Sequence, residues 1–149
     1  MPHNNEAGAQ RSDRASDLAR GVSRMLGHHG FACLTEFTLR SGRRVDVIGL
    51  DPKGRITIVE IKSSPEDFRS DQKWPEYLDY CDSYFFAVAE DFPKDILPQD
   101  VGLIVADAFS AAILRDSPPL SLNGSRRKTL VLQFAQVAGR RLAALSDPT

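Results

Sequence analysis

The segment Ile56-Thr57-Ile58-Val59-Glu60-Ile61-Lys62 carries the clearest structural pattern in this chain. It is apolar and β-branched apart from Thr57, Glu60 and Lys62, a composition that predicts a strand. Successive side chains of a strand point to opposite faces, so Glu60 and Lys62 share one face and lie side by side. A pair of charged residues is therefore expected at the end of an otherwise buried strand.

The next residues, Ser63-Ser64-Pro65-Glu66-Asp67, predict a helix that starts directly after this strand. Ser64 is a good N-cap, Pro65 suits the first turn, and the two acids face the positive end of the helix dipole. Pro75 interrupts the continuation of this helix, so we expect a kink or a restart there and an end around Asp82.

Outward from this unit, turn residues divide the chain into short periodic segments. Ser41-Gly42 and the run 51–54 separate apolar stretches of strand length, which predicts a three-stranded antiparallel meander. We expect a mixed α/β (α+β) fold in the order helix, meander, helix, strand, appended hairpin and C-terminal helix. The expected ranges are 13–30 for the first helix, 31–39, 44–50 and 55–62 for the meander, 84–89 for the next strand, 102–106 and 111–115 for the hairpin, and 126–145 for the last helix.

The totals predict one domain. A chain of 149 residues with 42% hydrophobic residues can bury a core without disulfides. Residues 1–12 are polar, and we expect them to form a disordered tail ahead of a single domain over 13–149. No apolar run has the length of a signal peptide or a membrane helix, and Cys33 and Cys81 lack metal or disulfide spacing, so we expect a cytoplasmic protein.

Asp46 lies in the strand before Glu60, and the hairpin between the two strands brings their side chains together. Two close carboxylates are costly to bury unless a cation neutralises them, and hard oxygen ligands favour Mg²⁺ or Mn²⁺. Such an ion activates water and polarises a phosphodiester, while Lys62 stabilises the developing negative charge. The alternative is a solvated salt bridge, worth about 0 to 1 kcal/mol. The acid in the preceding strand and the capped helix after Lys62 favour the metal site.

The order of elements, with an acid and then Glu-x-Lys in the meander, resembles the core of the PD-(D/E)XK, or restriction-endonuclease-like, nucleases. The stretch from Arg43 to Val88 is also similar to the MmcB-like DNA repair proteins of bacteria. The motifs that carry this similarity are Gly42-Arg-Arg-Val-Asp-Val, Ile58-Val-Glu-Ile-Lys-Ser-Ser, Asp67-Phe-Arg-Ser-Asp-Gln-Lys-Trp-Pro, Tyr77-Leu-Asp-Tyr-Cys-Asp and Gly102-Leu-Ile-Val-Ala-Asp. The resemblance implies a nuclease-like fold, a role in DNA repair, metal ligation by Asp46 and Glu60, and Lys62 as the catalytic lysine.

The sequence also offers candidates for two further ligands of the metal ion. The backbone carbonyl of Ile61 is a candidate third ligand of the metal. The superfamily often places a glutamate on its first helix, where this chain offers only Asp13 and Asp17, so Glu36 in the first strand is the better candidate for a third acid. The alternative, to which we give equal weight, is that Glu36 points to solvent at a sheet edge.

DNA contacts are expected from basic residues near this site. Lys73 and Tyr77 are four residues apart and share one face if the predicted helix is an α-helix, where they contact a phosphate or orient Lys62. Arg43 and Arg44 flank the turn before Asp46, and the last helix begins with Arg126, Arg127 and Lys128. The net charge of −1 lacks the basic excess that is typical of a DNA-binding protein.

These features predict a Mg²⁺- or Mn²⁺-dependent DNA endonuclease that acts in repair, with DNA and other repair proteins as partners. The alternative is a nuclease-fold module that binds DNA or a repair partner without cutting. The intact set of acid and Glu-x-Lys favours catalysis, whereas the near-neutral charge disfavours tight unaided binding. The oligomeric state stays open.

Overall fold

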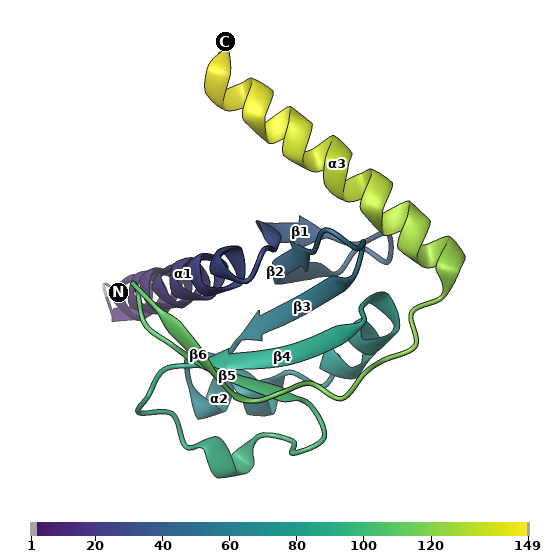
Figure 1. Cartoon of the computed structure of the whole chain (residues 1–149). Coiled ribbons are helices and arrows are strands. Elements are labelled where there is room, and N and C mark those ends of the chain that lie inside the picture. The colour runs from purple at the N-terminus through teal and green to yellow at the C-terminus, as the bar shows by residue number, and fades with distance from the viewer. Residues whose placement is uncertain (1–2, 149) are drawn as a thin grey trace.

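The computed structural model describes the backbone of residues 3–148 and the side chains of residues 13–148. The elements, shown in Figure 1, are α1 (His3–His28), β1 (Ala32–Thr38), β2 (Arg44–Leu50), β3 (Ile56–Ile61), α2 (Pro65–Ser70), a 3-10 helix (Trp74–Tyr80), β4 (Ser83–Val88), a short 3-10 turn (Lys94–Ile96), β5 (Gly102–Ala106), β6 (Ala111–Arg115) and α3 (Gly124–Ser146). This order confirms the predicted mixed α/β class. α1 begins at His3, earlier than the predicted start at 13, while the side chains of residues 1–12 lie outside the described part. The predicted disorder of that tail stays a prediction.

All six strands form one mixed sheet in the order of the sequence. β1, β2 and β3 are the predicted antiparallel meander, β4 and β5 run parallel to β3 and to each other, and β6 is antiparallel to β5. The segment with α2 and the 3-10 helix joins the parallel strands β3 and β4, because a parallel pair needs a crossover. The predicted hairpin, β5 and β6, is part of the same sheet.

Helix α1 covers one face of the sheet with an apolar stripe of helical spacing. Leu18, Val22, Met25 and Leu26 are buried there against Val47, Val59 and Ile61 and the neighbouring residues of β4 and β5. Gly21 lies within the stripe and lets the helix backbone approach the turn between β5 and β6: an added Cβ would lie 1.9 Å from the carbonyl oxygen of Asp107. The first helix is thus fixed directly over the ends of β2 and β3.

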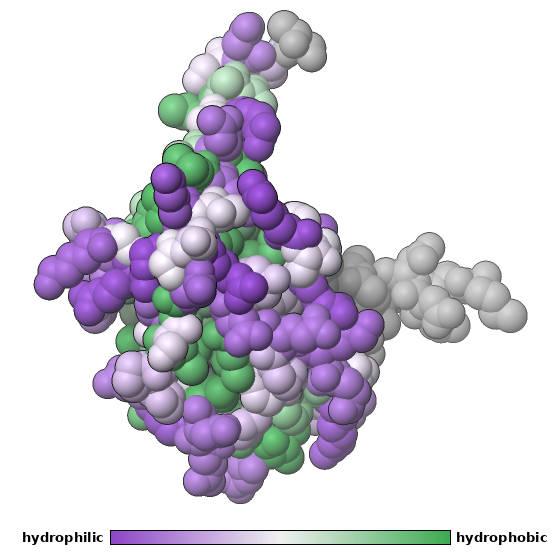
Figure 2. Space-filling model, turned by 90° about the vertical axis from the view of Figure 1, so that its right-hand side faces the viewer, coloured by the Kyte–Doolittle hydropathy of each residue, from purple (hydrophilic) through white to green (hydrophobic). Residues whose placement is uncertain are grey.

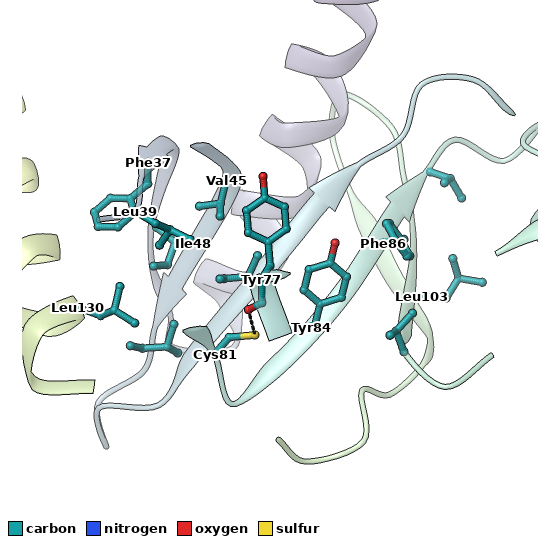
Figure 3. Packing of buried hydrophobic residues seen from close by; sticks show 14 of the residues in the cluster. Phe37, Leu39, Val45, Ile48, Tyr77, Cys81, Tyr84, Phe86, Leu103 and Leu130 are labelled. Carbon is teal, nitrogen blue, oxygen red and sulfur yellow. Dashed lines mark hydrogen bonds between the residues drawn. The ribbon is translucent and has the colours of Figure 1, made fainter. Parts of the chain in front are cut away.

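The opposite face carries an aromatic core, part of which Figure 3 shows. Tyr77 of the 3-10 helix, Tyr84 and Phe86 of β4, and Phe37 of β1 pack there, and the rings of Tyr77 and Tyr84 stack with centroids 6.5 Å apart. Because both faces of the sheet are covered, every residue of β3 is buried. Glu60 therefore lies in the interior, with 6% of its surface exposed.

The helix after β3 is shorter than predicted. Ser64 caps α2 as expected, accepting a hydrogen bond from the backbone N–H of Asp67, but α2 ends at Ser70 and a separate 3-10 helix begins at Trp74. The restart expected from Pro75 is confirmed, while a continuous face shared by Lys73 and Tyr77 is wrong. Lys73 precedes a 3-10 helix, whose period of three residues does not align positions four apart.

Helix α3 closes the edge of the sheet at β1. The side chain of Gln133 donates to the carbonyl of Thr38 (2.6 Å), and Arg141 donates to the carbonyls of Thr35 (2.6 Å) and Glu36 (2.9 Å). At its start, Arg127 makes two hydrogen bonds of 2.6 Å to the carboxylate of Asp82. Its last turns project away from the sheet (Figure 1), and residues 139–146 are all exposed.

Charge is distributed unevenly along the chain. Residues 50–122 contain 14 acidic and 7 basic side chains, whereas α3 contains five basic side chains and no acidic one. The near-neutral total therefore conceals an acidic part and a basic part. Within residues 3–148, no helix is both long enough and apolar enough to cross a membrane.

Candidate functional site

The ends of β2 and β3 bring Asp46 and Glu60 together. Val47 and Val59 are the last residues of β2 and β3 that pair regularly at the end of the hairpin away from its turn. Asp46 and Glu60 lie one residue beyond this pair, each on its own strand. Glu60 Oε1 accepts a hydrogen bond from the backbone N–H of Asp46 (3.1 Å), and Asp46 Oδ2 accepts one from the backbone N–H of Ile61 (2.8 Å). Each acid thus holds the backbone of the strand that carries the other.

Burial and the neighbouring Asp46 suppress the ionisation of Glu60. Burial raises the pKa of Glu60 to about 9, and the neighbouring charge of Asp46 adds to this effect. Burial also raises the pKa of Asp46, against the hydrogen bond from Ile61 that favours the charged form. Without a cation, the pair therefore retains a proton near neutral pH.

Lys62 is buried next to the acid pair, with 5% of its surface exposed. Its Nζ donates to Asp71 Oδ2 (2.7 Å), and its positive charge favours the ionised forms of Asp46 and Glu60. Burial works against ionisation of Asp71, but the hydrogen bonds from Lys62 and from the backbone of Lys73 and Trp74 hold its pKa below the usual range. Asp71 therefore fixes the position of the Lys62 ammonium.

A cleft of about 480 Å³ opens on Asp46, between the sheet and α1. Asp46, Ile61, Thr35 and Glu36 line one wall, and α1 supplies the other with Ala15, Ser16, Ala19, Arg20 and Ser23. The small side chains of α1 keep the cleft open. Arg20 is exposed at its wall and has no acidic partner within the described residues.

Glu36 lies in this cleft with unusual backbone geometry. Its φ is 51°, the left-handed region that non-glycine residues rarely adopt, and it lies opposite Asp46, where β1 and β2 do not pair although the register is the same on both sides. No group of three His, Cys, Asp or Glu side chains within residues 13–148 is close enough to bind one ion. Glu36 thus shares the cleft with Asp46 without completing a three-acid cluster.

The candidate DNA contacts fall into two groups. Arg44 and Lys73 are exposed, and neither forms an ion pair within the described residues. Arg43 is bound to Glu76 (2.8 Å), and Tyr77 is buried, with its hydroxyl donating to the carbonyl of Arg44 (3.3 Å). Tyr77 is therefore a support for the turn before Asp46, whereas Arg44 and Lys73 remain available.

Tyr84 stands beside Tyr77 in the core below the acid pair. Figure 3 shows the two rings side by side with their hydroxyls pointing the same way. The hydroxyl of Tyr84 is buried and has no hydrogen-bond partner within the described residues. Burial raises the pKa of Tyr77 to about 12, and Glu60 is the next cause, which places this hydroxyl in the field of the acid pair.

The donor set fits a hard divalent cation. Two carboxylates and the carbonyl of Ile61 offer only oxygen, and the repulsion between the two acids is what a cation would relieve. Mg²⁺ and Mn²⁺ accept one or two carboxylates and keep several waters, whereas structural zinc sites need three or four protein ligands that include nitrogen or sulfur. The residues present therefore suit Mg²⁺ or Mn²⁺.

Two residues of the site, Asp71 and Arg20, were not predicted from the sequence. A buried lysine needs an acidic partner, but Asp67 and Asp71 are both in reach by sequence, and only the end of α2 at Ser70 selects Asp71. Arg20 carries no signal in the sequence, since it is one of several polar residues on the solvent side of α1.

The chain is thus a small mixed α/β domain with a buried pair of acids and a lysine at the end of its central strands, beside a polar cleft. A family model described as "DNA repair protein MmcB-like" matches residues 2–149, and the chain belongs to this family of DNA repair proteins. It is also similar to a solved structure, the SPO1766 protein of unknown function from Silicibacter pomeroyi. The two are 51% identical, with 91% of each chain covered and a TM-score of 0.86. No curated protein matches the chain.

Proposed function

We propose that the protein is a Mg²⁺- or Mn²⁺-dependent nuclease of the PD-(D/E)XK type that hydrolyses DNA phosphodiester bonds during repair. The contact between Asp46 and Glu60 beside Lys62, with Asp46 lining a cleft, is the observation that carries this proposal. A merely solvated salt bridge would leave these groups exposed, whereas Glu60 and Lys62 are both buried. Family membership supports DNA as the substrate.

Each side chain has a defined task in this proposal. Asp46, Glu60 and the carbonyl of Ile61 would hold the cation, which would supply a Lewis acid and lower the pKa of a water molecule bound to it. Lys62, held by Asp71, offers its ammonium to the negative charge that develops on the phosphate. Arg20 at the wall of the cleft binds a non-bridging phosphate oxygen of the scissile or a neighbouring nucleotide.

The test is nicking of supercoiled plasmid by the purified chain with Mg²⁺ or Mn²⁺. We expect nicking that EDTA abolishes, and a rate lower by on the order of 100-fold or more in Asp46→Asn and in Lys62→Ala. Lys53→Ala, which removes an exposed lysine in the turn between β2 and β3, is the matched control and should nick at the wild-type rate. Wild-type nicking by Asp46→Asn would mean that this site does not cut DNA.

One observation favours a second function, a nuclease-fold module that binds DNA without cutting. Lys62 is already neutralised by Asp71, so its ammonium is less available to a phosphate than that of an unpaired lysine. If the chain binds duplex DNA in EDTA but never nicks it, and Lys62→Ala binds equally well, the module is the correct function.

We also propose that the protein works in the cytoplasm. Both cysteines are free thiols, and burial raises the pKa of Cys33 to about 11, which keeps it unreactive. Free, protonated thiols suit a reducing compartment.

A further inference from the structure

The outer face of α3 carries a seam of apolar and small side chains with a lysine and a serine at its ends, and no residue among those whose side chains are described packs against it. Its members recur with spacings of four, three, four, three and four residues, the heptad pattern of paired helices. They are Lys128, Leu132, Ala135, Gly139, Leu142 and Ser146. All six are exposed, and the two leucines expose 58% and 65% of their surface. Figure 2 shows apolar patches on this projecting helix.

This seam is distinct from the face by which α3 packs on its own chain. Leu130 and Phe134 are buried against the aromatic core, and Gln133 and Arg141 bind the carbonyls of β1. The seam lies on the other side of the helix, at 100° per residue. Apart from the hydrogen bonds of Arg141 to β1, the last turns are exposed over residues 139–146, and an isolated helix of this length is marginal in water. A partner on the outer face would supply the missing packing.

We infer that α3 pairs with α3 of a second copy of this chain in antiparallel orientation, with the two-fold axis at the level of Val137. The spacing of the seam residues is symmetric about Val137. Leu132 then faces Leu142 of the other copy, and Ala135 faces Gly139. A two-fold interface requires this reciprocity, because each residue pair must occur twice. The small residues at the centre let the two helices approach closely.

Charge selects the antiparallel arrangement. A parallel pair would set Lys128 against Lys128 at the start of the seam, in a helix that has no acidic residue. The antiparallel pair sets Lys128 level with Ser146 and next to Asp147, the acid that directly follows the helix. The two domains do not collide, because each lies on the side of its helix opposite to the seam.

The first experiment measures the mass of the full chain in solution over a range of concentrations. We expect a dimer of twice the 16.5 kDa chain mass. The double variant Leu132→Glu/Leu142→Glu should raise the dimer dissociation constant by about 100-fold or more, since it places charges in a closely packed seam. Leu114→Glu, which alters an exposed leucine of β6, is the matched control and should remain dimeric.

The second experiment fixes the orientation and does not depend on a destabilising variant. In a Cys33→Ser background, chains with Leu132→Cys are mixed with chains with Leu142→Cys and oxidised. The antiparallel pair predicts cross-links in the mixture and none in Leu132→Cys alone, because those sulfurs would be about 15 Å apart along the axis. Cys81 is buried and does not interfere.

Three results would overturn the inference. A wild-type chain that stays monomeric at high concentration has no such pairing. Cross-linking of Leu132→Cys with itself would show a parallel pair. A monomeric wild type whose Leu132→Glu/Leu142→Glu variant loses affinity for duplex DNA would show that the face contacts nucleic acid instead. None of these results bears on nicking, which Asp46→Asn tests separately.

Discussion

Glu60 is an acidic residue in the interior of the protein, with 6% of its surface exposed. Its pKa is raised from an ordinary 4.5 to about 9, first by burial and then by Asp46. The folded chain therefore binds a proton that the unfolded chain releases above pH 4.5. By linkage, the stability that this proton supplies is complete below pH 4.5 and is lost as the pH rises toward 9.

Replacement of this group should therefore stabilise the metal-free protein. We expect Glu60→Gln, in EDTA at pH 8, to gain at least about 1 kcal/mol, or roughly 3 °C in Tm, because the amide needs no proton to stay neutral. The gain should vanish near pH 4.5. Thermal melts between pH 4.5 and 9 measure this, with the exposed Glu66→Gln as the control. Parallel curves for wild type and Glu60→Gln would contradict the pKa shift.

At the same scale, the alternation of Glu60 and Lys62 and the hairpin pairing of β2 with β3 were enough to predict that Asp46 lies beside Glu60. Parity alone does not place Asp46, because Val45 and Ile48, three residues apart, pack in the same cluster. Asp71 and Arg20 could not be placed, because their positions depend on where α2 ends and on how α1 is rotated over the sheet. The position of Glu36 depends on its positive φ, and a glutamate in the sequence does not predict that backbone conformation.

At the scale of elements, the approach of α1 to the turn between β5 and β6 is the tightest contact of the helix. A Cβ on Gly21 would meet two backbone oxygens, those of Asp107 at 1.9 Å and Ser110 at 2.7 Å. These backbone atoms cannot move aside as the end of a flexible side chain can. The position of α1 over the cleft therefore depends on this glycine.

We expect Gly21→Ala to lower the free energy of unfolding by about 1 to 3 kcal/mol, the usual effect of overpacking. Gly27 belongs to the same helix, and a Cβ there meets nothing within 4 Å. Gly27→Ala should therefore raise stability by up to about 1 kcal/mol through helix propensity alone. Urea unfolding of both variants gives the comparison. Equal effects of the two substitutions would show that the contact at Gly21 is not tight.

The sequence predicted the elements well where period and turn chemistry agree, as in the meander and β4. Between Asp71 and Asp82 it predicted the restart at Pro75 but not that the new segment is a 3-10 helix. Packing of Trp74 and Tyr77 on Tyr84 and Phe86 favours the 3-10 helix, and this packing involves a strand that follows later in the chain. Local propensity does not contain that information.

At the scale of the whole molecule, a net charge of −1 does not exclude DNA binding. Individual exposed cations without an ion pair would bind the phosphates, whatever the average charge of the chain. Arg44 and Lys73 are the exposed cations without an ion pair among the predicted contacts.

We expect Arg44→Gln and Lys73→Gln each to weaken binding to duplex DNA and to reduce the slope of log K against log salt by about 0.9, the value for one phosphate contact. Lys94→Gln, whose lysine binds the carbonyl of Glu90 in the acidic part, should keep the wild-type slope. Titrations of labelled duplex at several salt concentrations, in EDTA, provide the measurement. An unchanged slope in both variants would place the DNA elsewhere on the surface.

The bonds from α3 to β1 have a consequence for the life of the molecule in a crowded cell. An outermost strand with free carbonyls is a template on which extended segments of other chains can add, the first step toward amyloid-like assembly. Gln133 and Arg141 occupy three of these carbonyls, at Thr35, Glu36 and Thr38. A chain cut by proteolysis before Gln133 would keep Asp46 and Glu60 but lose the side chains that bind the carbonyls of β1. We expect such a chain to aggregate through this strand.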